Sequence, residues 1–392
     1  MKEGISTGTR IGSYIRRLRE NYGYTLRRVE QRSQAIGDCI DNSQLSRFEK
    51  GKSFPSFEKL RILAKVFNIP VQNFSDMLDL EVFDQFKPTG TNFNELMETG
   101  SREFEAGNFG RAYVIFERCL EVEKSGTREE RAERKARARG RMAIALKKLG
   151  KLSMTEMELR SILRDRSLLS APTQIRTLLQ LASVNREMGD RYLAAIISRE
   201  CLELSLAEND RQSQAASRQI LGNVLFEDGQ PGRAVPHFEA SLDLWELLGQ
   251  KQKKITLLAT LGECLCCQKQ SVKGWSRLKR ALHLARKLSD RRGAAYTLHK
   301  MAVVCFREQR GKEGHDFITR SNLEADQEPE RYVDIIFANT FLQWDEANGL
   351  GNQTQAKIAF GRLKHLRPDL ERRLPEVERF DEYLRRSQSH VA

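Results

Sequence analysis

Residues 221–238 read LGNVLFEDGQPGRAVPHF, and this stretch decides the fold of most of the chain. Gly222 stands among large apolar residues, Gly229 follows it by seven residues, and Ala234 and Phe238 come next. Two helices joined by a tight turn approach closely only where the facing side chains are small, because protein interiors are densely packed. Glycine also suits the end of a helix, since it adopts the left-handed conformation readily. The stretch therefore predicts a helical hairpin that turns at Gly229.

The same spacing recurs with a period near forty residues. Small residues equivalent to Gly222 follow one another at intervals of 43, 39, 40, 40 and 40, at Gly100, Ala143, Ala182, Gly222, Gly262 and Ala302. A second small residue stands twelve positions after most of them, at Ala112, Ala194, Ala234, Gly274 and Gly314, and Thr155 breaks this series. Turn glycines follow the first series by seven residues at Gly107, Gly150, Gly189 and Gly229. Such periodicity indicates stacked helical hairpins.

This pattern resembles the tetratricopeptide repeat, with longer helices than its minimal unit of about 34 residues. Six hairpins are recognisable, and a seventh over residues 330–366 has the right length without the small residues. The resemblance implies that the first helix of each hairpin lines an inner groove that binds extended peptides or partner helices. We expect groove residues just past the small positions, although a plain solvated helix face explains them as well: Ser101, Phe104, Lys147, Arg186, Asn223, Phe226, Glu263, Phe306 and Arg307.

The N-terminal part predicts five short helices. The first has apolar residues at helical spacing, with charged residues on the opposite face: Ile11, Ile15 and Leu18 against Arg16, Arg17, Arg19 and Glu20. Thr25 caps the second helix, and an irregular stretch follows from about Ser33 to Asn42. A third helix begins near Ser43, buries Leu45 and Phe48, and ends at Gly51; Pro55 and Ser56 open the fourth helix, and residues 71–78 form the fifth.

This order of helices and caps resembles the XRE family, the helix-turn-helix proteins of the Cro and lambda-repressor type. The resemblance implies that the helix from Ser43 enters the major groove, where amides, hydroxyls and guanidinium groups bond base edges. It assigns base contacts to Asn42, Ser43, Gln44, Ser46 and Arg47, and phosphate contacts to Thr25, Arg27, Lys50 and Lys52. The turn before that helix is about five residues longer than the family's usual three or four. The extra residues, including Gly37, Asp38 and Cys39, suit either a surface insertion or a further DNA contact.

Composition narrows the class of protein. The net charge of +13 favours acidic partners, and it is densest in residues 1–80, which carry 14 Lys and Arg against 9 Asp and Glu. No apolar run approaches the roughly 20 residues that span a bilayer, and residues 1–6 lack an apolar signal core. Seven scattered cysteines do not resemble a disulfide framework. We therefore expect a cytoplasmic protein with reduced thiols and no membrane association.

A group of three cysteines and a basic run are two further candidate sites, for a metal ion and for a nucleic acid. Cys264, Cys266 and Cys267 form a C-x-x-C pattern with no second pair and no nearby histidine, which disfavours a metal or redox site. The basic run from Arg128 to Arg141 suits a second nucleic-acid surface, but its interspersed glutamates favour a solvated helix with internal ion pairs. No catalytic signature is present, so we expect neither an enzyme nor a cofactor.

The predicted fold is all-α: a lambda-repressor-like domain over residues 9–78, a linker over 79–91, a tetratricopeptide-like α-solenoid over 92–370, and a capping helix and tail over 371–392. The leading hypothesis is a sequence-specific transcription regulator, a homodimer on double-stranded DNA whose repeats bind a signalling peptide or a partner protein. The alternative hypothesis is an interaction scaffold that sequesters a partner protein, with DNA binding secondary.

Overall fold

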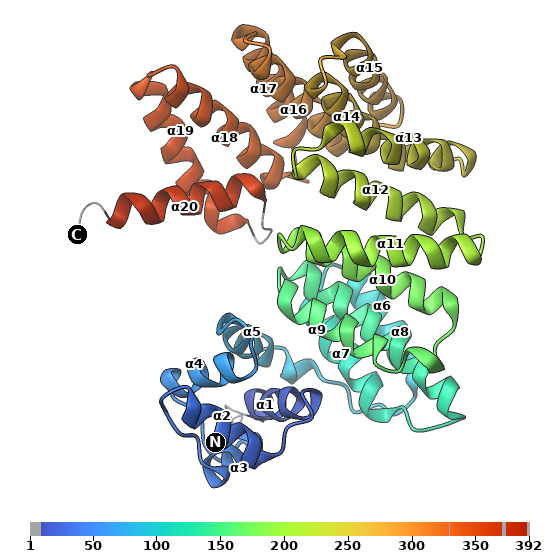
Figure 1. The fold of residues 1–392 in the computed structure, drawn as a ribbon, viewed down its shortest axis with the longest axis vertical. Helices are drawn as coiled ribbons and strands as arrows, with labels where there is room; N and C mark the ends of the chain where they lie inside the picture. The colour runs from blue at the N-terminus through green and yellow to red at the C-terminus, as the bar shows by residue number, and fades with distance from the viewer. Residues whose placement is uncertain (1–8, 329, 371–373, 390–392) are drawn as a thin grey trace. The chain divides into compact units, whose positions relative to one another are not determined.

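The structure, a computed structural model, describes residues 9–328, 330–370 and 374–389, and every regular element in this part of the chain is helical (Figure 1). The prediction of an all-α fold is confirmed. The N-terminal residues 1–6 and parts of the C-terminal tail, about which the sequence made predictions, lie outside the described residues. No helix in the described ranges is long and apolar enough to cross a membrane.

The chain divides into two compact units, residues 1–168 and 169–392. The helices of the first unit are α1 (Thr9–Asn21), α2 (Leu26–Ala35), α3 (Asn42–Glu49), α4 (Phe57–Val66), α5 (Gln72–Glu81), η1 (Asp84–Phe86), α6 (Phe93–Glu105), α7 (Phe109–Val122), α8 (Arg128–Lys148), α9 (Leu152–Leu163) and η2 (Arg166–Leu168). The first five form the predicted small domain, and α6 to α9 form two hairpins. This unit therefore holds both kinds of predicted structure.

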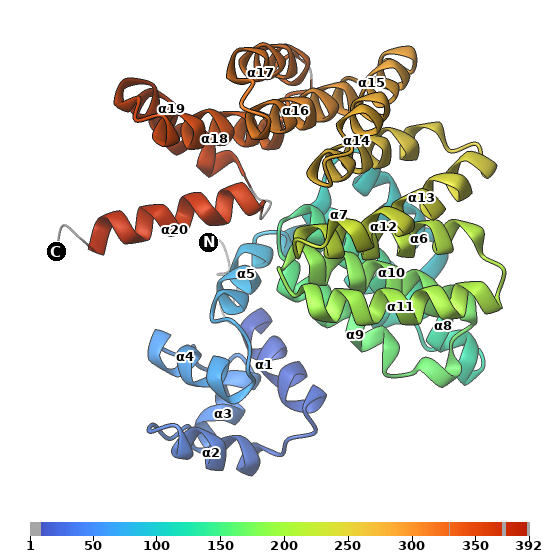
Figure 2. The ribbon, with the colours of Figure 1, turned by 45° about the horizontal axis from the view of Figure 1, so that its top comes forward.

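The second unit continues the hairpins and ends with a single helix (Figure 2). Its helices are α10 (Ala171–Glu187), α11 (Arg191–Ala207), α12 (Arg211–Glu227), α13 (Pro231–Leu247), α14 (Lys251–Cys267), α15 (Ser271–Lys287), α16 (Arg291–Arg307), α17 (Gly311–Ala325), α18 (Val333–Gly349), α19 (Gln353–Leu366), η3 (Arg367–Asp369) and α20 (Pro375–Ser389). The helices α10, α12, α14 and α16 begin forty residues apart, as the sequence period predicts.

Three hairpins show a close contact between a glycine of the first helix and a large residue of the second. A Cβ atom added to Gly222 would lie 2.6 Å from the ring of Phe238, and one added to Gly100 would lie 2.6 Å from the ring of Phe116. A Cβ atom added to Gly262 would lie 2.7 Å from Cγ of Leu278. Real Cβ atoms do not approach carbon so closely, so these positions require glycine unless the partner moves. The predicted small-residue series marks these helix crossings.

A buried hydrogen bond repeats at the same register in the second unit. Ser241 Oγ donates to the carbonyl of Ala215 at 2.8 Å, and Ser321 Oγ donates to the carbonyl of Ala295 at 2.8 Å. Cys201 Sγ lies 3.5 Å from the corresponding carbonyl of Ile175. In each pair a side chain of a second helix reaches the first helix 26 residues earlier. These bonds satisfy buried polar groups and hold the two helices in one register.

The turns keep their conformation even where the sequence loses its glycine. Gly189 and Gly229 have φ angles of +86° and +71°, and the equivalent residues Lys269 and Gln309 have +61° and +58°. This left-handed backbone is unfavourable for residues with a Cβ atom. The period of the chain is therefore held by helix packing and not by turn glycines alone.

Two features of the small domain differ from the sequence prediction. The second helix includes Ser33 and runs to Ala35, so the turn before α3 spans the six residues 36–41, fewer than expected. Arg16 faces solvent, but Arg17 and Arg19 do not. Arg17 pairs with Glu158 and Arg19 pairs with Glu49, both of the first unit. Helical periodicity separates apolar from polar positions, but it does not show which polar side chains meet another element.

Substitution of Gly222 with alanine tests the crossing contact. We expect G222A to lower the free energy of unfolding by about 1–3 kcal/mol, because the new methyl group meets the buried Phe238 ring. Chemical denaturation followed by circular dichroism measures this loss. The double variant G222A/F238L imitates the pair Ala143 and Leu159 of another hairpin, and we expect it to lose less than the two single variants together.

The matched control is Gly140, in the interior of α8, where an added Cβ atom meets nothing within 4 Å. We expect G140A to be neutral or to stabilise the chain by up to about 1 kcal/mol, because alanine favours the helix more than glycine does. Equal destabilisation by G140A and G222A would contradict the crossing contact.

Candidate nucleic-acid interface and inner repeat surface

The helix α3 presents the residues predicted to read bases. Asp41 caps it by accepting a hydrogen bond from the Gln44 amide at 2.7 Å, and Leu45 and Phe48 bury its other face. Asn42, Ser43 and Arg47 are exposed, whereas Gln44 and Ser46 are half-buried. The helix is therefore anchored by its apolar side and leaves an amide, hydroxyl and guanidinium surface toward solvent.

Arg47 and Ser43 contact each other in the free chain. The Arg47 guanidinium lies 3.4 Å from Ser43 Oγ, and Ser43 Oγ donates to Asp41 Oδ1 at 2.6 Å. The hydrogen bonds from Ser43 and from the Gln44 amide lower the pKa of Asp41. These contacts are exposed, so both side chains can exchange them for contacts with bases. The assignment of individual base contacts stays a prediction.

The long turn before α3 is an ordered loop. Ile40 is fully buried, and its amide donates to Ser33 Oγ at 3.0 Å. Lys59, on α4, donates to Asp38 Oδ1 and to the Cys39 carbonyl, both at 2.9 Å. The extra residues therefore fix the start of α3 against the domain core. Sequence reasoning missed Lys59, because nothing local marks its partner 21 residues earlier.

The residues predicted to contact phosphates lie at helix ends around α3. Thr25 caps α2 by accepting from the Arg28 amide at 3.1 Å. Arg27, Lys50 and Lys52 are exposed, and their side chains make no hydrogen bond or ion pair in the described ranges. Exposed cations without an acidic partner are available to phosphate oxygens.

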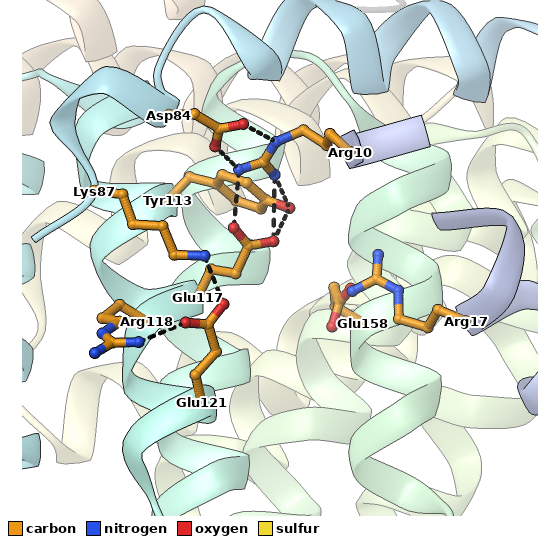
Figure 3. Close-up of polar contacts among 9 residues, drawn as sticks. All are labelled: Arg10, Arg17, Asp84, Lys87, Tyr113, Glu117, Arg118, Glu121 and Glu158. Atoms are coloured by element: carbon orange, nitrogen blue, oxygen red, sulfur yellow. Dashed lines mark hydrogen bonds and ion pairs between the residues drawn. The ribbon is translucent and has the colours of Figure 1, made fainter. Parts of the chain in front are cut away.

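A buried ionic cluster joins the small domain to the first hairpin (Figure 3). Arg10 of α1, whose side chain is 6% exposed, donates to Asp84 Oδ2 at 3.1 Å and to Glu117 Oε2 at 2.9 Å. Tyr113 completes the cluster, with its hydroxyl 3.3 Å from both Arg10 and Glu117. Burial disfavours the charged form of Arg10, but Asp84 and Glu117 outweigh it and raise the pKa of the guanidinium. Arg10 therefore stays charged inside the joint.

A second pair connects the small domain to the second hairpin. Arg17 of α1 lies 2.7 Å from Glu158 of α9, whose side chain is 1% exposed (Figure 3). Lys151, just before α9, lies 3.1 Å from Asp76 and 2.8 Å from Asp79, both of α5. Buried ion pairs need specific geometry to offset the cost of desolvation. These pairs therefore fix the orientation of α1 and α5 on α7 and α9.

The nine predicted groove residues all lie on first helices, three of them in the first unit and six in the second. Arg186 pairs with Glu227 at 2.6 Å. The Phe104 ring packs on Phe109 of the same hairpin, and the Phe306 ring contacts His315 across its own turn. Ser101 donates a hydrogen bond to the Met97 carbonyl, and the Lys147 side chain is not without a partner. Asn223 and Phe226 are half-buried.

Glu263 and Arg307 are the groove residues that meet. Glu263 is buried and lies 3.5 Å from Arg307 and 2.9 Å from Lys300, a residue that the sequence prediction missed. Burial disfavours its charged form, but Lys300 and Arg307 lower the pKa of Glu263 overall. Lys300 also lies over the ring of Tyr296, at 5.4 Å. This cluster joins α14 to α16.

Polar contacts continue from α16 to α18. His299 Nδ1 lies 2.9 Å from Asn339 Oδ1, while Asn339 Nδ2 donates to Ser321 Oγ at 2.9 Å and to Asn322 Oδ1 at 2.8 Å. The two bonds from Nδ2 fix the amide orientation, so His299 is the donor at Nδ1. Burial lowers the pKa of His299, which keeps the ring neutral. His299 and Asn339 stand forty residues apart, so the repeat period could have identified them.

The cysteine cluster is packed into its hairpin. Cys264 and Cys266 are buried, and burial raises the pKa of Cys264 to about 12 and that of Cys266 to about 11. Buried thiols of this kind pack as small apolar side chains. In the part of the chain that the structure describes, no three His, Cys, Asp or Glu residues gather as a metal site would require.

Comparison with known proteins agrees with this architecture. The helix-turn-helix family matches residues 15–74. A comparison with curated protein sequences gives no match. Among solved structures the chain is similar to a Rap protein complexed with Competence and Sporulation Factor, with 17% identity and a TM-score of 0.54 over 91% of this chain and 95% of that chain.

Two other solved structures are similar. Aspartyl phosphate phosphatase F from Bacillus subtilis has 14% identity and a TM-score of 0.55, over 96% of this chain and 97% of that chain. PlcR from Bacillus thuringiensis, in complex with the peptide PapR7 and DNA, has 18% identity and a TM-score of 0.41, over 72% of this chain and 96% of that chain. Likeness at these identities concerns the fold alone. The family match and the two structures with TM-scores above 0.5 agree with the prediction that an XRE-type helix-turn-helix domain precedes tetratricopeptide-like repeats.

Removal of the Arg10 side chain tests the joint. We expect R10A to lower the opening free energy of α1, measured by hydrogen exchange, by roughly 3 kcal/mol, because Asp84 and Glu117 lose a buried partner. The control is R16A, since Arg16 pairs with Glu20 on the exposed face of the same helix. We expect less than about 0.5 kcal/mol from that exposed pair. Similar exchange in both variants would show that the cluster does not hold α1.

Proposed function

We propose that this chain, in which an XRE-type helix-turn-helix domain precedes tetratricopeptide-like repeats, is a cytoplasmic, sequence-specific transcription regulator. The proposal rests mainly on α3, which keeps Asn42, Ser43 and Arg47 exposed on a helix whose apolar face is buried. In helix-turn-helix proteins this helix lies in the major groove. A homodimer would place two such helices on the two halves of a palindromic operator.

The repeats, in this proposal, bind a short peptide or a protein segment and thereby control the DNA-binding domain. Several first helices contact the first helix of the next hairpin, namely α10 with α12, α14 with α16 and α16 with α18, as expected of an inner layer. The similar Rap structure was determined in complex with Competence and Sporulation Factor, which supports a ligand on this fold. Asn223 lies half-exposed on α12 and has no hydrogen-bond partner in the described ranges. An amide both donates and accepts, as a peptide backbone requires.

We further propose that the chain acts by binding and not by catalysis. One similar structure is a phosphatase, but that likeness extends to the fold alone. The helix-turn-helix domain instead connects the repeats to a nucleic acid. A regulator needs no cofactor for this role, because the effector acts through its different affinity for two states of the protein.

Replacement of Arg47 tests DNA reading. The operator is first selected from genomic fragments retained by the chain, and its binding is then followed by fluorescence anisotropy. We expect R47A to weaken operator binding by roughly 1–3 kcal/mol, the value of a bidentate base contact. Binding to random duplexes should change little. The control R160A removes an exposed arginine from α9. An R47A curve that matches R160A on the operator would exclude Arg47 from base reading.

Replacement of Asn223 tests the inner layer. The chain is incubated with a pool of short synthetic peptides, and retained peptides are identified by mass spectrometry and titrated singly. We expect N223A to bind them roughly tenfold more weakly, which corresponds to about 1.4 kcal/mol. The control K279A changes an exposed residue of the second helix α15. Equal affinities in N223A, K279A and the unchanged chain would remove Asn223 from the ligand surface.

A further inference from the structure

The helix α8 carries a stripe of four cations that the fold does not use. Arg128, Arg131, Lys135 and Arg139 share one side of the helix, because their spacings of three, seven and eleven residues return to the same face. Arg128 and Lys135 are exposed and the other two are half-exposed. We call these four residues the α8 stripe. At 1.5 Å per residue it extends over about 16 Å.

Two acidic residues near the α8 stripe, Glu123 and Glu130, bind groups outside the stripe. Glu130 accepts the Thr127 amide at 3.0 Å in a capping box, and Glu123 pairs with Arg134 at 2.9 Å. Glu129 is close enough to Arg128 to interact with its charge. Across the described residues, however, no hydrogen bond or ion pair joins an acidic side chain to any of the four cations. The predicted explanation of this run, internal helical ion pairs, is therefore wrong for the α8 stripe.

The α8 stripe works against the stability of its own helix. Arg131, Lys135 and Arg139 follow one another at four-residue intervals, where like charges repel. Arg128 stands in the first turn, where the helix dipole disfavours a cation. Four cations in this arrangement lower the stability of α8, and a bound anionic partner would offset that effect. The arrangement therefore points to a ligand rather than to packing.

We propose that the α8 stripe binds the phosphate backbone of duplex DNA outside the half-site that α3 reads. This inference rests on the proposed DNA-binding function and adds a second contact to it. A row of cations about 16 Å long spans nearly half of the roughly 34 Å in which duplex DNA completes one turn. The α8 stripe and the helix-turn-helix domain belong to the same compact unit of the chain. Contacts to phosphates increase affinity on any sequence and do not select bases.

The test uses the full chain and two duplexes of random sequence, one long and one just long enough for a single half-site. The variant R128Q/R131Q/K135Q/R139Q removes the α8 stripe. The control K273Q/R277Q/K279Q/K287Q removes four cations of α15 that also have no acidic partner in the described residues, so both variants change the net charge equally. Circular dichroism verifies that both variants stay folded.

On the long duplex we expect the α8 variant to bind at least tenfold more weakly than the control. The slope of log affinity against log salt should also fall by about 0.9 for each phosphate that the variant no longer neutralises. The short duplex should show little difference between the two variants. The charge-preserving variant R128K/R131K/R139K should bind the long duplex like the unchanged chain.

Equal affinity and equal salt slope of the α8 variant and the control on the long duplex would overturn the inference. A second result would also overturn it. If the unchanged chain binds an acidic protein and the α8 variant does not, while both bind DNA equally, the α8 stripe serves a protein partner. Failure of the proposed function looks different. In that case the unchanged chain does not bind the selected operator, or R47A leaves operator binding as it was.

Discussion

The fold depends on one steric constraint, the close approach of two helices where a glycine or alanine of the first meets a larger residue of the second. Gly222 leaves room for the Phe238 ring, and Gly262 leaves room for Leu278. This contact fixes where the helices cross and hence how long each must be before the chain turns. Lys269 and Gln309 keep the left-handed turn without glycine, which shows that the turn does not require glycine where the helices cross closely.

The repeats could be predicted from the sequence because every crossing is local. The contacting residues stand sixteen positions apart in one hairpin, so a fixed spacing exposes them. The helix α3 was predictable for the same reason, since its cap, its apolar face and its closing glycine lie within eleven residues, Asp41 to Gly51. The length of the turn before it was overestimated. Ser33 continues α2, and its side chain binds the Ile40 amide across the loop.

The ionic joint could not be predicted, because its partners are far apart in the sequence. Arg10 and Glu117 are separated by 107 residues, and Arg17 and Glu158 by 141. An arginine on the polar side of a short helix has the same local pattern whether it faces water or a carboxylate of another element. The cluster of Glu263 and Lys300 lies between these cases. Glu263 stands at a predicted position and Lys300 does not, although both lie on first helices, because pairing between neighbouring hairpins leaves no mark in the spacing of either one.

The use of buried charge in this joint has a consequence for the proposed response to an effector. Apolar side chains of similar volume would hold two elements together at least as well as a buried ion pair does. An ionic cluster instead stabilises only the arrangement in which Arg10 reaches both Asp84 and Glu117, since any sliding of α1 leaves a charge unpaired at low dielectric. The small domain is therefore fixed to the first two hairpins in one orientation. A rearrangement of those hairpins on effector binding would then move α3 as well, because α1 is tied to α7 and α9 and packs against α3. The segment between α5 and α6 need not transmit anything by itself.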